Sequence, residues 1–319
     1  MLATRSKAGT GDGAMTEDEP RLLRGGPIAA VIREQVAADV GAFRAEHGFA
    51  PALAVLVVGK DAPSAVYLHK ILDGCRLVGI EDRLVELAAD ATEADVAAAL
   101  RVLDADPHVA GIITQMPLPP GIKLRAVIDT LDPLRDIDGI HPLNAGLLAL
   151  GYDGFLPATA HASIEILKQS GIEIAGKHAV VVGRSNVIGK PAALLLLREN
   201  ATVTVCHSKT ADLGSVIRVA DIVIVAIGRA NFVTGDMLKP GAVVVDVGIN
   251  VVDGKLVGDV DFASASRVVS AITPVPGGVG PLTNAILLTH LVRAARDQAA
   301  GRVPLGARSL AVAMPETNR

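Results

Sequence analysis

Aromatic residues and cysteine are scarce in this sequence. It has no tryptophan, and Phe, Tyr and Trp together account for 2% of its 319 residues. Modules that bind single-stranded nucleic acid stack bases on aromatic rings, so this composition argues against that class. The two cysteines, Cys75 and Cys206, are too few for a disulfide framework or for a zinc site with four thiolates. We expect both to be small apolar fillers.

A strong charge of one sign and long apolar runs are also absent. Lys and Arg number 30 against 34 Asp and Glu, so the net charge of -4 attracts neither a polyanion nor a membrane surface. No apolar run approaches the ~20 residues of a membrane span, and the N-terminus lacks the charged-then-apolar order of a signal peptide. The eight His show no metal-ligand spacing. These absences predict a cytoplasmic protein with no nucleic-acid, membrane or metal partner.

Aliphatic residues and glycine are abundant, and short apolar runs alternate with helical patterns. Apolar runs that end in glycine are typical of strands buried on both faces of a parallel sheet. We expect strands at 52–59, 83–87 and 109–115 in a first series, and at 179–183, 202–207, 221–228, 242–248 and 267–272 in a second. Strands that alternate with helices imply right-handed crossovers, and a break near 141–157 separates the two series. The predicted fold class is therefore α/β, with two α/β domains and a ligand cleft between them.

The expected domain boundaries follow from these series and from the composition of the chain ends. Small, polar and charged residues without periodicity predict a disordered extension over 1–21, and the pattern fades into a tail over 299–319. The first domain is expected to take in 22–155 together with 282–298, which holds the last predicted helix. The second, a Rossmann-like domain, is expected over 156–281.

The second series opens with VVVGRSNVIGKP, which is typical of a dinucleotide-binding turn. Gly183 ends the strand, and Gly189 opens a helix whose free N–H groups favour a phosphate. The spacing of these glycines differs from the G-x-G-x-x-G fingerprint. It also differs from the Walker A loop, which has four residues between its glycines and a Ser or Thr where this sequence has Pro191. We therefore interpret the segment as a dinucleotide site and not as a site of nucleotide triphosphate hydrolysis.

The next strand indicates which dinucleotide binds. An NAD site places Asp or Glu at the end of this strand, ~20 residues beyond the glycines, to bind the ribose 2′-hydroxyl. Here the strand ends in VCHSKT, without a carboxylate, and Ser208, Lys209 and Arg184 offer donors and positive charge for a 2′-phosphate. The pattern favours NADP as the cofactor. An ordinary turn with solvated basic residues is the alternative.

Three further segments have a composition that packing does not explain. The loop TPVPGGVGPLT at 273–283 is rigid and lets a ligand approach its backbone closely. The turn DIDGIHP at 136–142 holds two carboxylates and a His, of which Asp136 and His141 can serve the turn itself. Gln115 ends the third strand, at the edge that is expected to face the cleft.

In this order, the motifs resemble those of the bifunctional methylenetetrahydrofolate dehydrogenase/methenyltetrahydrofolate cyclohydrolase family. The resemblance covers 29–291 and includes S-x-x-Y at 64–67, GIITQMPLP, DIDGIHPLNAG, VVGRSNVIGKP, VDVGIN and TPVPGGVGPLT. It implies a homodimeric oxidoreductase of one-carbon metabolism, linked to purine biosynthesis, that oxidises 5,10-methylenetetrahydrofolate by hydride transfer to NADP. The first domain would be the catalytic, folate-binding one, and the partners would be tetrahydrofolate one-carbon derivatives.

The resemblance also implies roles for individual residues. Asp138 would hold the amino-pyrimidine edge of the pterin, Gln115 would orient the one-carbon bridge, and Tyr67 would pack against the aminobenzoyl ring. These three are the expected catalytic residues, although a Tyr on a helix is also a common packing residue. Gly280 and Pro281 would line the folate slot. The NADP contacts carried over are Gly183, Arg184, Ser185, Ser208 and the backbone near Ile249.

One departure from the family bears on its second activity. Family members hydrolyse the methenyl product to 10-formyltetrahydrofolate with a Lys in the pattern S-x-x-Y-x-x-x-K-x-K-x-C. With the register pinned by Tyr67 and Cys75, the two Lys positions hold Ile71 and Asp73. Ile cannot transfer a proton, so general acid–base assistance of ~10²–10⁴-fold should be missing. Lys70 is adjacent but points about 100° round the helix. We expect the hydrolase activity to be weak or lost.

A second departure lies at 158–162, where the sequence reads ATAHA and the family usually reads C-T-P-x-G. His161 has no counterpart role in the family. We expect it to be a solvated His at the start of a helix.

Two functions of other kinds stay open. A different two-domain dehydrogenase, such as the shikimate dehydrogenase type, would need a Lys/Asp pair in the cleft of the first domain, and none stands out. An inactive paralogue could bind folate or NADP as a sensor, but the retained Asp138, Gln115 and Tyr67 favour the enzyme.

Overall fold

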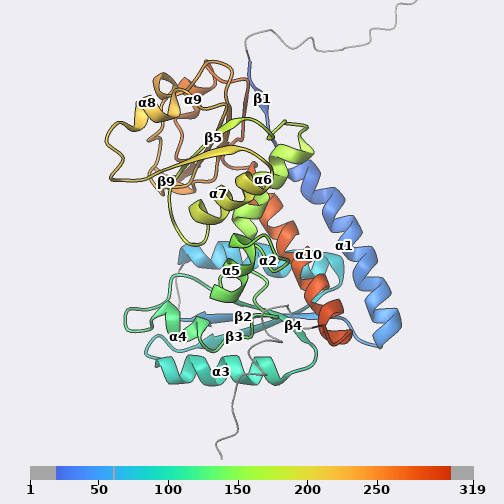
Figure 1. Ribbon diagram of the computed structural model, residues 1–319. Coiled ribbons are helices and arrows are strands. Elements are labelled where there is room, and N and C mark those ends of the chain that lie inside the picture. The colour runs from blue at the N-terminus through green and yellow to red at the C-terminus, as the bar shows by residue number, and fades with distance from the viewer. Residues whose placement is uncertain (1–18, 60–61, 303–319) are drawn as a thin grey trace, which may run out of the picture.

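The computed structural model describes residues 19–59 and 62–302, apart from the side chains of 62–67. Two α/β units lie one above the other, and helix α10 (Val279–Ala299) runs from one to the other (Figure 1). Helix α10 contacts α1 (Gly25–His47) along its length, β4 (Val109–Thr114) below and α6 (Ala158–Gln169) above. This helix therefore holds both units together.

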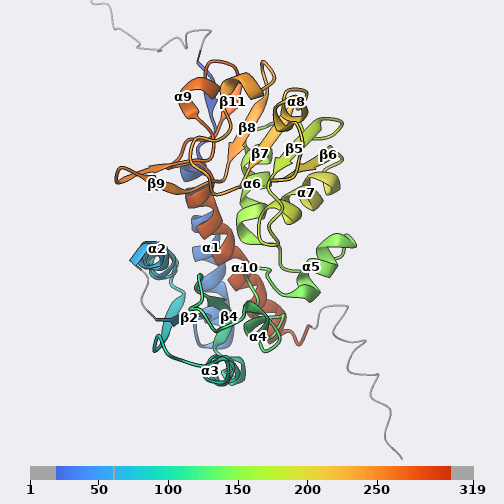
Figure 2. The same ribbon diagram turned by 90° about the vertical axis from the view of Figure 1, so that its left-hand side faces the viewer.

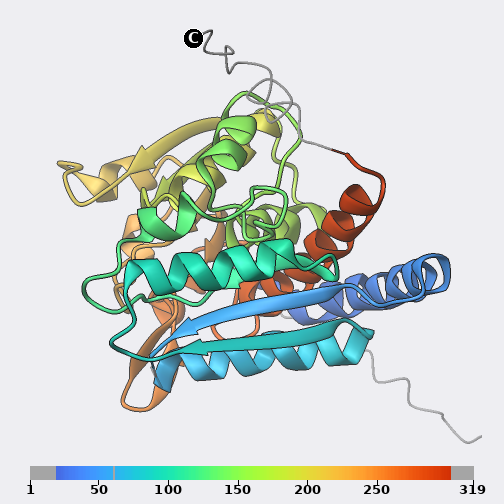
Figure 3. The ribbon, with the colours of Figure 1, turned by 90° about the horizontal axis from the view of Figure 1, so that it is seen from below.

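The lower unit contains a parallel three-stranded sheet in the order β3–β2–β4. Strands β2 (Ala52–Val58) and β3 (Glu81–Leu87) join β4 in this sheet. The helices of the unit are α2 (Ala62–Val78), α3 (Glu93–Ala105) and α4 (Leu124–Ile128). Leu53 and Val55 of β2 belong to the core shared with α1, α2 and α10, whereas Ala54 and Leu56 belong to the core shared with α3. Figure 3 shows β2 and β3 between α2 and α3. Burial on both faces explains why β2 is apolar throughout.

The upper unit contains a parallel six-stranded sheet in the order β1–β11–β8–β7–β5–β6. The strands are β1 (Arg21–Leu22), β5 (His178–Val182), β6 (Thr202–Cys206), β7 (Ile222–Val225), β8 (Val243–Asp246) and β11 (Ala271–Ile272). The helices around it are α7 (Gly189–Arg198), α8 (Leu213–Ile217) and α9 (Phe262–Ala265), with a 3-10 turn at Gly235–Met237. Because β6 and β7 flank β5 on opposite sides, the chain reverses its direction of travel at β5. Ligands of such sheets bind at the carboxyl ends of the strands at this reversal.

Two smaller elements border the space between the units. Helix α5 (Pro142–Ala149) follows the DIDGIHP turn, and the antiparallel hairpin of β9 (Asn250–Val252) and β10 (Lys255–Val257) follows β8. In Figure 2 the hairpin and α2 lie on the same side of α10.

The chain ends differ in part from the expected boundaries. Arg21 was expected in the disordered extension, yet it pairs with Ala271 in β1 of the upper sheet, and Ala299 still belongs to α10. Residues 1–18 of the expected extension and 303–319 of the expected tail lie outside the described residues. The domain boundaries at 155/156 and 281/282 stay a prediction.

Candidate active site

The turn between β5 and α7 is closely packed at both of its glycines. Gly183 has φ +133, and a Cβ on it would collide with the carbonyl of Ala226. A Cβ on Gly189 would collide with the carbonyl of Gly183. The Ser185 hydroxyl accepts hydrogen bonds from the N–H groups of Ile188 (3.1 Å) and Gly189 (3.3 Å). The turn is therefore fixed by backbone geometry and brings the N-terminus of α7 to the carboxyl edge of the sheet, where its N–H groups attract anions.

The turn after β6 is stabilised by its own hydrogen bonds. The Thr210 hydroxyl accepts from the N–H of His207 at 2.9 Å, and His207 Nδ1 accepts from the N–H of Lys209 at 3.1 Å. The side chains of Ser208 and Lys209 are left exposed, as is that of Arg184. Val182 of β5 and Cys206 of β6 are register partners, so Arg184 and Ser208 follow neighbouring strand ends at the same level. The turn has no carboxylate, and its donors and cations fit a phosphorylated ribose.

A buried carboxylate that no sequence motif indicated supports the neighbouring loop. Asp259 is fully buried, and it accepts hydrogen bonds from the N–H groups of Ile227 (2.6 Å), Gly228 (2.9 Å) and Arg229 (2.8 Å). It also accepts from Nδ2 of Asn250 at 2.9 Å. This one side chain therefore fixes the loop after β7 next to the β5–α7 turn.

Asp246 has a similar role at the end of β8. It is buried, and it accepts hydrogen bonds from the N–H groups of Gly248 (2.9 Å), Asp259 (3.0 Å) and Val260 (2.9 Å). Burial raises the pKa of Asp246 to about 6, and these N–H groups counteract that shift. The N–H of Asp246 in turn donates to the Thr273 hydroxyl at 2.7 Å, which links β8 to the 273–283 loop.

A cavity of about 640 Å³ lies where the two units meet. The expected cofactor contact Ile249 and the expected folate contacts Gly280 and Pro281 all line it. Other lining residues come from α1, α2, the start of α6 and the hairpin: Arg33, Lys70, Asp73, Gly74, Leu77, Thr159 and Leu256. Gln115 and Asp138 are not among its lining residues. The structure therefore brings part of the expected cofactor group and part of the expected folate group to one cavity.

Asp138 lies beside the start of α6, where it contacts the backbone of Ala158, the residue before the cavity-lining Thr159. Burial and, to a smaller extent, the nearby charge of Asp136 raise the pKa of Asp138 to about 7, against the lowering effect of a hydrogen bond from the backbone of Ala158. Thr159, which follows Ala158, lines the cavity. Asp138 is thus a carboxyl group that changes charge near neutral pH, at the edge of the cavity.

Asp136 is committed to the turn. It is fully buried, and its carboxylate accepts from the N–H groups of Ile140 (3.1 Å) and His141 (2.7 Å) and from Nδ2 of Asn144 (2.8 Å). His141 caps α5, because its Nδ1 accepts from the N–H of Leu143 at 3.0 Å. Both side chains therefore shape the turn that presents Asp138.

Gln115 follows β4 directly. Its Nε2 donates to the carbonyl of Met116 at 3.1 Å, while its Oε1 is buried without a hydrogen-bond partner among the described residues. The same holds for Oδ1 of Asn284, which lines the cavity. Buried amide oxygens are normally paired, so both are available to donors of a ligand or of water.

Helix α2 presents Lys70, Asp73 and Gly74 to the cavity. Ile71 is 1% exposed and belongs to the main apolar core. The residue at the family's Lys position is therefore an apolar core residue with no proton to give. The side chain of Tyr67 lies outside the described residues, so its expected stacking role stays a prediction.

His161 corrects one expectation, because it is not a solvated His. Its Nδ1 lies 3.3 Å from Nε2 of His290, and burial lowers the pKa of His161. Helix α6 packs against α10 and α7, and the ring of His161 is withdrawn from solvent against His290 of α10. Cys75 and Cys206 are buried, and burial raises the pKa of both thiols, as suits apolar fillers.

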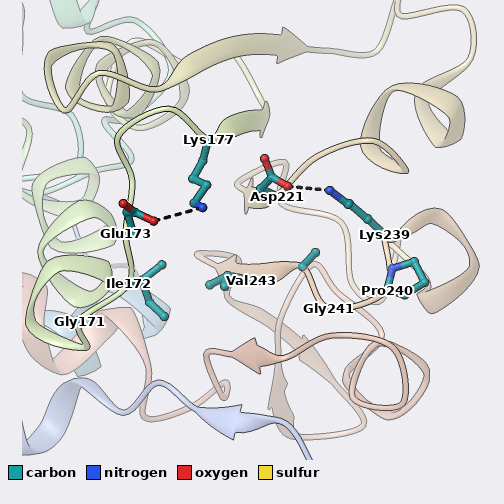
Figure 4. Close-up of a pocket in the computed structure, with 10 residues that line it drawn as sticks. Gly171, Ile172, Glu173, Lys177, Asp221, Lys239, Pro240, Gly241 and Val243 are labelled. Atoms are coloured by element: carbon teal, nitrogen blue, oxygen red, sulfur yellow. Dashed lines mark hydrogen bonds and ion pairs between the residues drawn. The ribbon is translucent and has the colours of Figure 1, made fainter.

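A second cavity, of about 360 Å³, lies at the amino ends of the strands of the upper sheet, on the side opposite to the β5–α7 turn (Figure 4). Its two lysines are paired with acids: Lys177 with Glu173 at 3.2 Å and Lys239 with Asp221 at 2.7 Å. It lies at the amino ends of β5, β7 and β8, where ligands of such sheets do not bind. None of the expected site residues lines it.

A Rossmann-like sheet with a phosphate-binding first turn, facing a second α/β unit across a cavity, defines a two-domain dinucleotide-dependent enzyme. Comparison with known proteins narrows this class. The chain belongs to the tetrahydrofolate dehydrogenase/cyclohydrolase family: residues 23–138 match its catalytic domain, and residues 157–299 match its NAD(P)-binding domain.

This chain matches its relatives over nearly their whole length. The bifunctional protein FolD of Roseiflexus sp. (strain RS-1) is 49% identical over 282 residues, which are 88% of this chain and 98% of that protein. A structure of the bifunctional FolD methylenetetrahydrofolate dehydrogenase/cyclohydrolase of Campylobacter jejuni matches with a TM-score of 0.85 and 41% identity, over 87% of this chain and 99% of that one. The Trypanosoma brucei enzyme, solved with NADP and an inhibitor, gives a TM-score of 0.84 at 34% identity, over 88% and 99%.

These comparisons confirm the family resemblance and the α/β fold class. They do not favour a dehydrogenase of the shikimate type, because the family match extends over both units of the chain.

Proposed function

We propose that this protein oxidises 5,10-methylenetetrahydrofolate to 5,10-methenyltetrahydrofolate with NADP as the hydride acceptor. The main support is the 640 Å³ cavity, because Ile249 lines it together with Gly280 and Pro281. Hydride transfer requires the donor and acceptor carbons at near-attack distance and needs no protein base. The protein can therefore promote this reaction by holding the two ligands in one orientation.

The residues around β5 and β6 fit NADP. Gly183 and Gly189 allow the close turn that brings the start of α7 to the carboxyl edge of the sheet, where its N–H groups would bind the pyrophosphate. Arg184, Ser208 and Lys209 would bind the 2′-phosphate. When bound, NADP supplies the nicotinamide carbon that accepts the hydride. Asp246 and Asp259 keep the adjoining loops in place through backbone hydrogen bonds.

The folate end of the site depends on Asp138. A carboxylate can accept two N–H bonds from the amino-pyrimidine edge of a pterin. Because burial raises the pKa of Asp138 to about 7, the group accepts fully only above neutral pH, unless the ligand's donors stabilise its charge.

The test is to mix purified protein with 5,10-methylenetetrahydrofolate and either NADP or NAD, and to follow the reduced dinucleotide by absorbance. We expect kcat/KM with NADP to exceed that with NAD by ~10–100-fold, since charge-assisted hydrogen bonds to the 2′-phosphate contribute ~1.5–3 kcal/mol. A protein that binds folate and NADP but forms no NADPH would be the inactive paralogue.

We also propose that the hydrolase step is weak or lost, because the fully apolar Ile71 stands at the Lys position. Hydrolysis of 5,10-methenyltetrahydrofolate should be close to its rate in buffer. Ile71→Lys should raise the rate by up to ~10²-fold if the neighbouring geometry is retained. Lys70→Ala is the matched control, since Lys70 lines the cavity. Rapid hydrolysis that Lys70→Ala abolishes would show that Lys70 has taken over, and would overturn this proposal.

The assembly and setting of the protein are further proposals. The outer strand β6 leaves one edge of the upper sheet unpaired within the described part of the chain, and Val205 on it is 40% exposed. We infer a homodimer that pairs through this edge, which light scattering would reveal as twice the chain mass. None of the helices in the described ranges is long and apolar enough to cross a membrane. We propose a cytoplasmic enzyme that supplies one-carbon units for purine biosynthesis.

A further inference from the structure

Two histidines that the proposed reaction does not use lie behind the Asp138 turn. His290 of α10 is 6% exposed, and its Nδ1 lies 2.8 Å from the carbonyl oxygen of Ile137. Its Nε2 lies 3.3 Å from Nδ1 of His161 in α6, and the two ring planes differ by only 13°. Phe155 packs beside His290 with its ring centre 5.8 Å away.

The direction of these hydrogen bonds follows from the chemistry of the groups. A carbonyl oxygen only accepts, so Nδ1 of His290 carries the proton and donates to Ile137. Nε2 of a neutral His290 is then an acceptor, and Nδ1 of His161 donates to it. Burial lowers the pKa of His290 to about 3, so this neutral form persists at neutral pH.

This chain of donors ends one residue before Asp138. The side chain of Ile137 is fully buried, and a Cβ on Gly111 of β4 would collide with it, so Ile137 is held tightly against the lower sheet. His290 holds the carbonyl of the same residue from the other side. The peptide that joins Ile137 to Asp138 is thus oriented from α10, and the carboxyl of Asp138 meets the backbone of Ala158 at the start of α6.

We infer that His290, itself oriented by His161, is a positioning residue that aims Asp138 at the pterin through the carbonyl of Ile137. This inference rests on the proposed function, in which Asp138 binds the pterin. It also gives His161 a role: α6 and α10, two of the helices that line the cavity, both contribute to the orientation of a single carboxylate.

Two substitutions at one position separate the donor from the rest of the ring. His290→Leu keeps most of the volume and removes the donor. His290→Asn places an amide N–H near the position of Nδ1 and removes only the acceptor for His161. We expect His290→Leu to raise KM for 5,10-methylenetetrahydrofolate about tenfold, because the buried carbonyl of Ile137 loses its donor and the turn relaxes. We expect His290→Asn to stay within about twofold of the parent in KM, and kcat and KM for NADP to change little in both variants.

A control variant and a second measurement distinguish the positioning role of His290 from a merely structural one. Lys177→Ala, at the far cavity, should leave all constants unchanged. Thermal unfolding with NADP present checks that each variant is folded. Calorimetric folate binding in an Asp138→Asn background then tests the route: if His290 acts through Asp138, His290→Leu should have less than about twofold further effect there.

Three results would overturn the inference. They are a folded His290→Leu variant with unchanged folate KM, a His290→Asn variant as impaired as His290→Leu, and an equal loss of folate binding with and without Asp138. If the parent protein forms no NADPH, the proposed function fails first, and the calorimetric comparison still tests the inference by folate binding alone.

Discussion

The two ends of the cavity are built by different means. At the cofactor end, backbone geometry forms the site: Gly183 and Gly189 allow the close turn, and the start of α7 supplies N–H groups. At the folate end, single side chains form the site, and Asp138 depends on a turn held by Asp136 and His290. A backbone site is visible in the sequence as glycine spacing, whereas the side-chain site also depends on His290, which lies far from the turn in the sequence.

The difference also predicts how each end fails. Adding atoms should destroy the backbone site, because there is no space for them. Removing charge or a hydrogen bond should weaken the side-chain site by steps.

The largest effect is expected for Gly183→Ala. The new Cβ would collide with the carbonyl of Ala226 at a φ of +133, so the turn must move. We expect the Kd for NADP to rise about 100-fold, since strained or displaced backbone costs ~1–3 kcal/mol and the phosphate contacts are lost as well. Gly241→Ala is the control, because Gly241 has φ +79 but no atom within 4 Å of its added Cβ. Equal losses in the two variants would indicate backbone strain alone.

A smaller effect is expected for Asp138→Asn at the other end. The substitution removes the negative charge and turns one acceptor oxygen into a donor, so charge-assisted bonds to the pterin are lost. We expect kcat/KM for 5,10-methylenetetrahydrofolate to fall ~10–100-fold with the Kd for NADP unchanged. A parallel loss of NADP affinity would contradict the separation of the two ends.

The pH dependence of folate binding should follow the same carboxyl. With a pKa of about 7, Asp138 is charged above neutral pH and neutral below it. KM for the folate should therefore rise as pH falls, by about tenfold between pH 8 and pH 6, and Asp138→Asn should abolish the dependence. Steady-state rates in buffers of constant ionic strength measure this. A flat profile in the parent protein would show that the ligand does not meet this carboxyl.

The smallest effect is expected for Lys209→Ala. Lys209 is exposed, and its turn is held by the backbone and by Thr210, so its loss removes charge without moving the chain. We expect KM for NADP to rise about fivefold and KM for NAD to stay constant, with a smaller difference at high salt. A loss of affinity for both dinucleotides would mean that Lys209 supports the turn itself.

Part of this molecule could be predicted from its sequence. Most strands of both sheets were expected. The clearest of them, β2, β5 and β7, are largely apolar runs, and burial on both faces makes such runs conspicuous. Helix α1 and the two-residue strand β1 had no counterpart among the expected elements, whereas β11 occupies only the last two residues of the strand expected over 267–272. The glycine turn was visible because its geometry tolerates no Cβ at Gly183 or Gly189.

Two supporting residues, Asp259 and His290, could not be predicted, because their partners are far away in the sequence. Asp259 binds the N–H of Ile227 from 32 residues away, and His290 binds the carbonyl of Ile137 from 153 residues away. Neither residue belongs to a local motif, and a single polar residue also fits a surface position. His161 was placed in solvent for the same reason, since its partner lies on a different helix.

One measurement tests the whole account most directly: a single-turnover reaction of the protein with NADP and 5,10-methylenetetrahydrofolate, in which NADPH and every folate product are quantified. A dehydrogenase that has Ile71 in place of the proton-transferring Lys should release one 5,10-methenyltetrahydrofolate for each NADPH, and 10-formyltetrahydrofolate should then appear only at the rate seen without protein. Failure to form NADPH, or formation of 10-formyltetrahydrofolate as fast as NADPH, would contradict it.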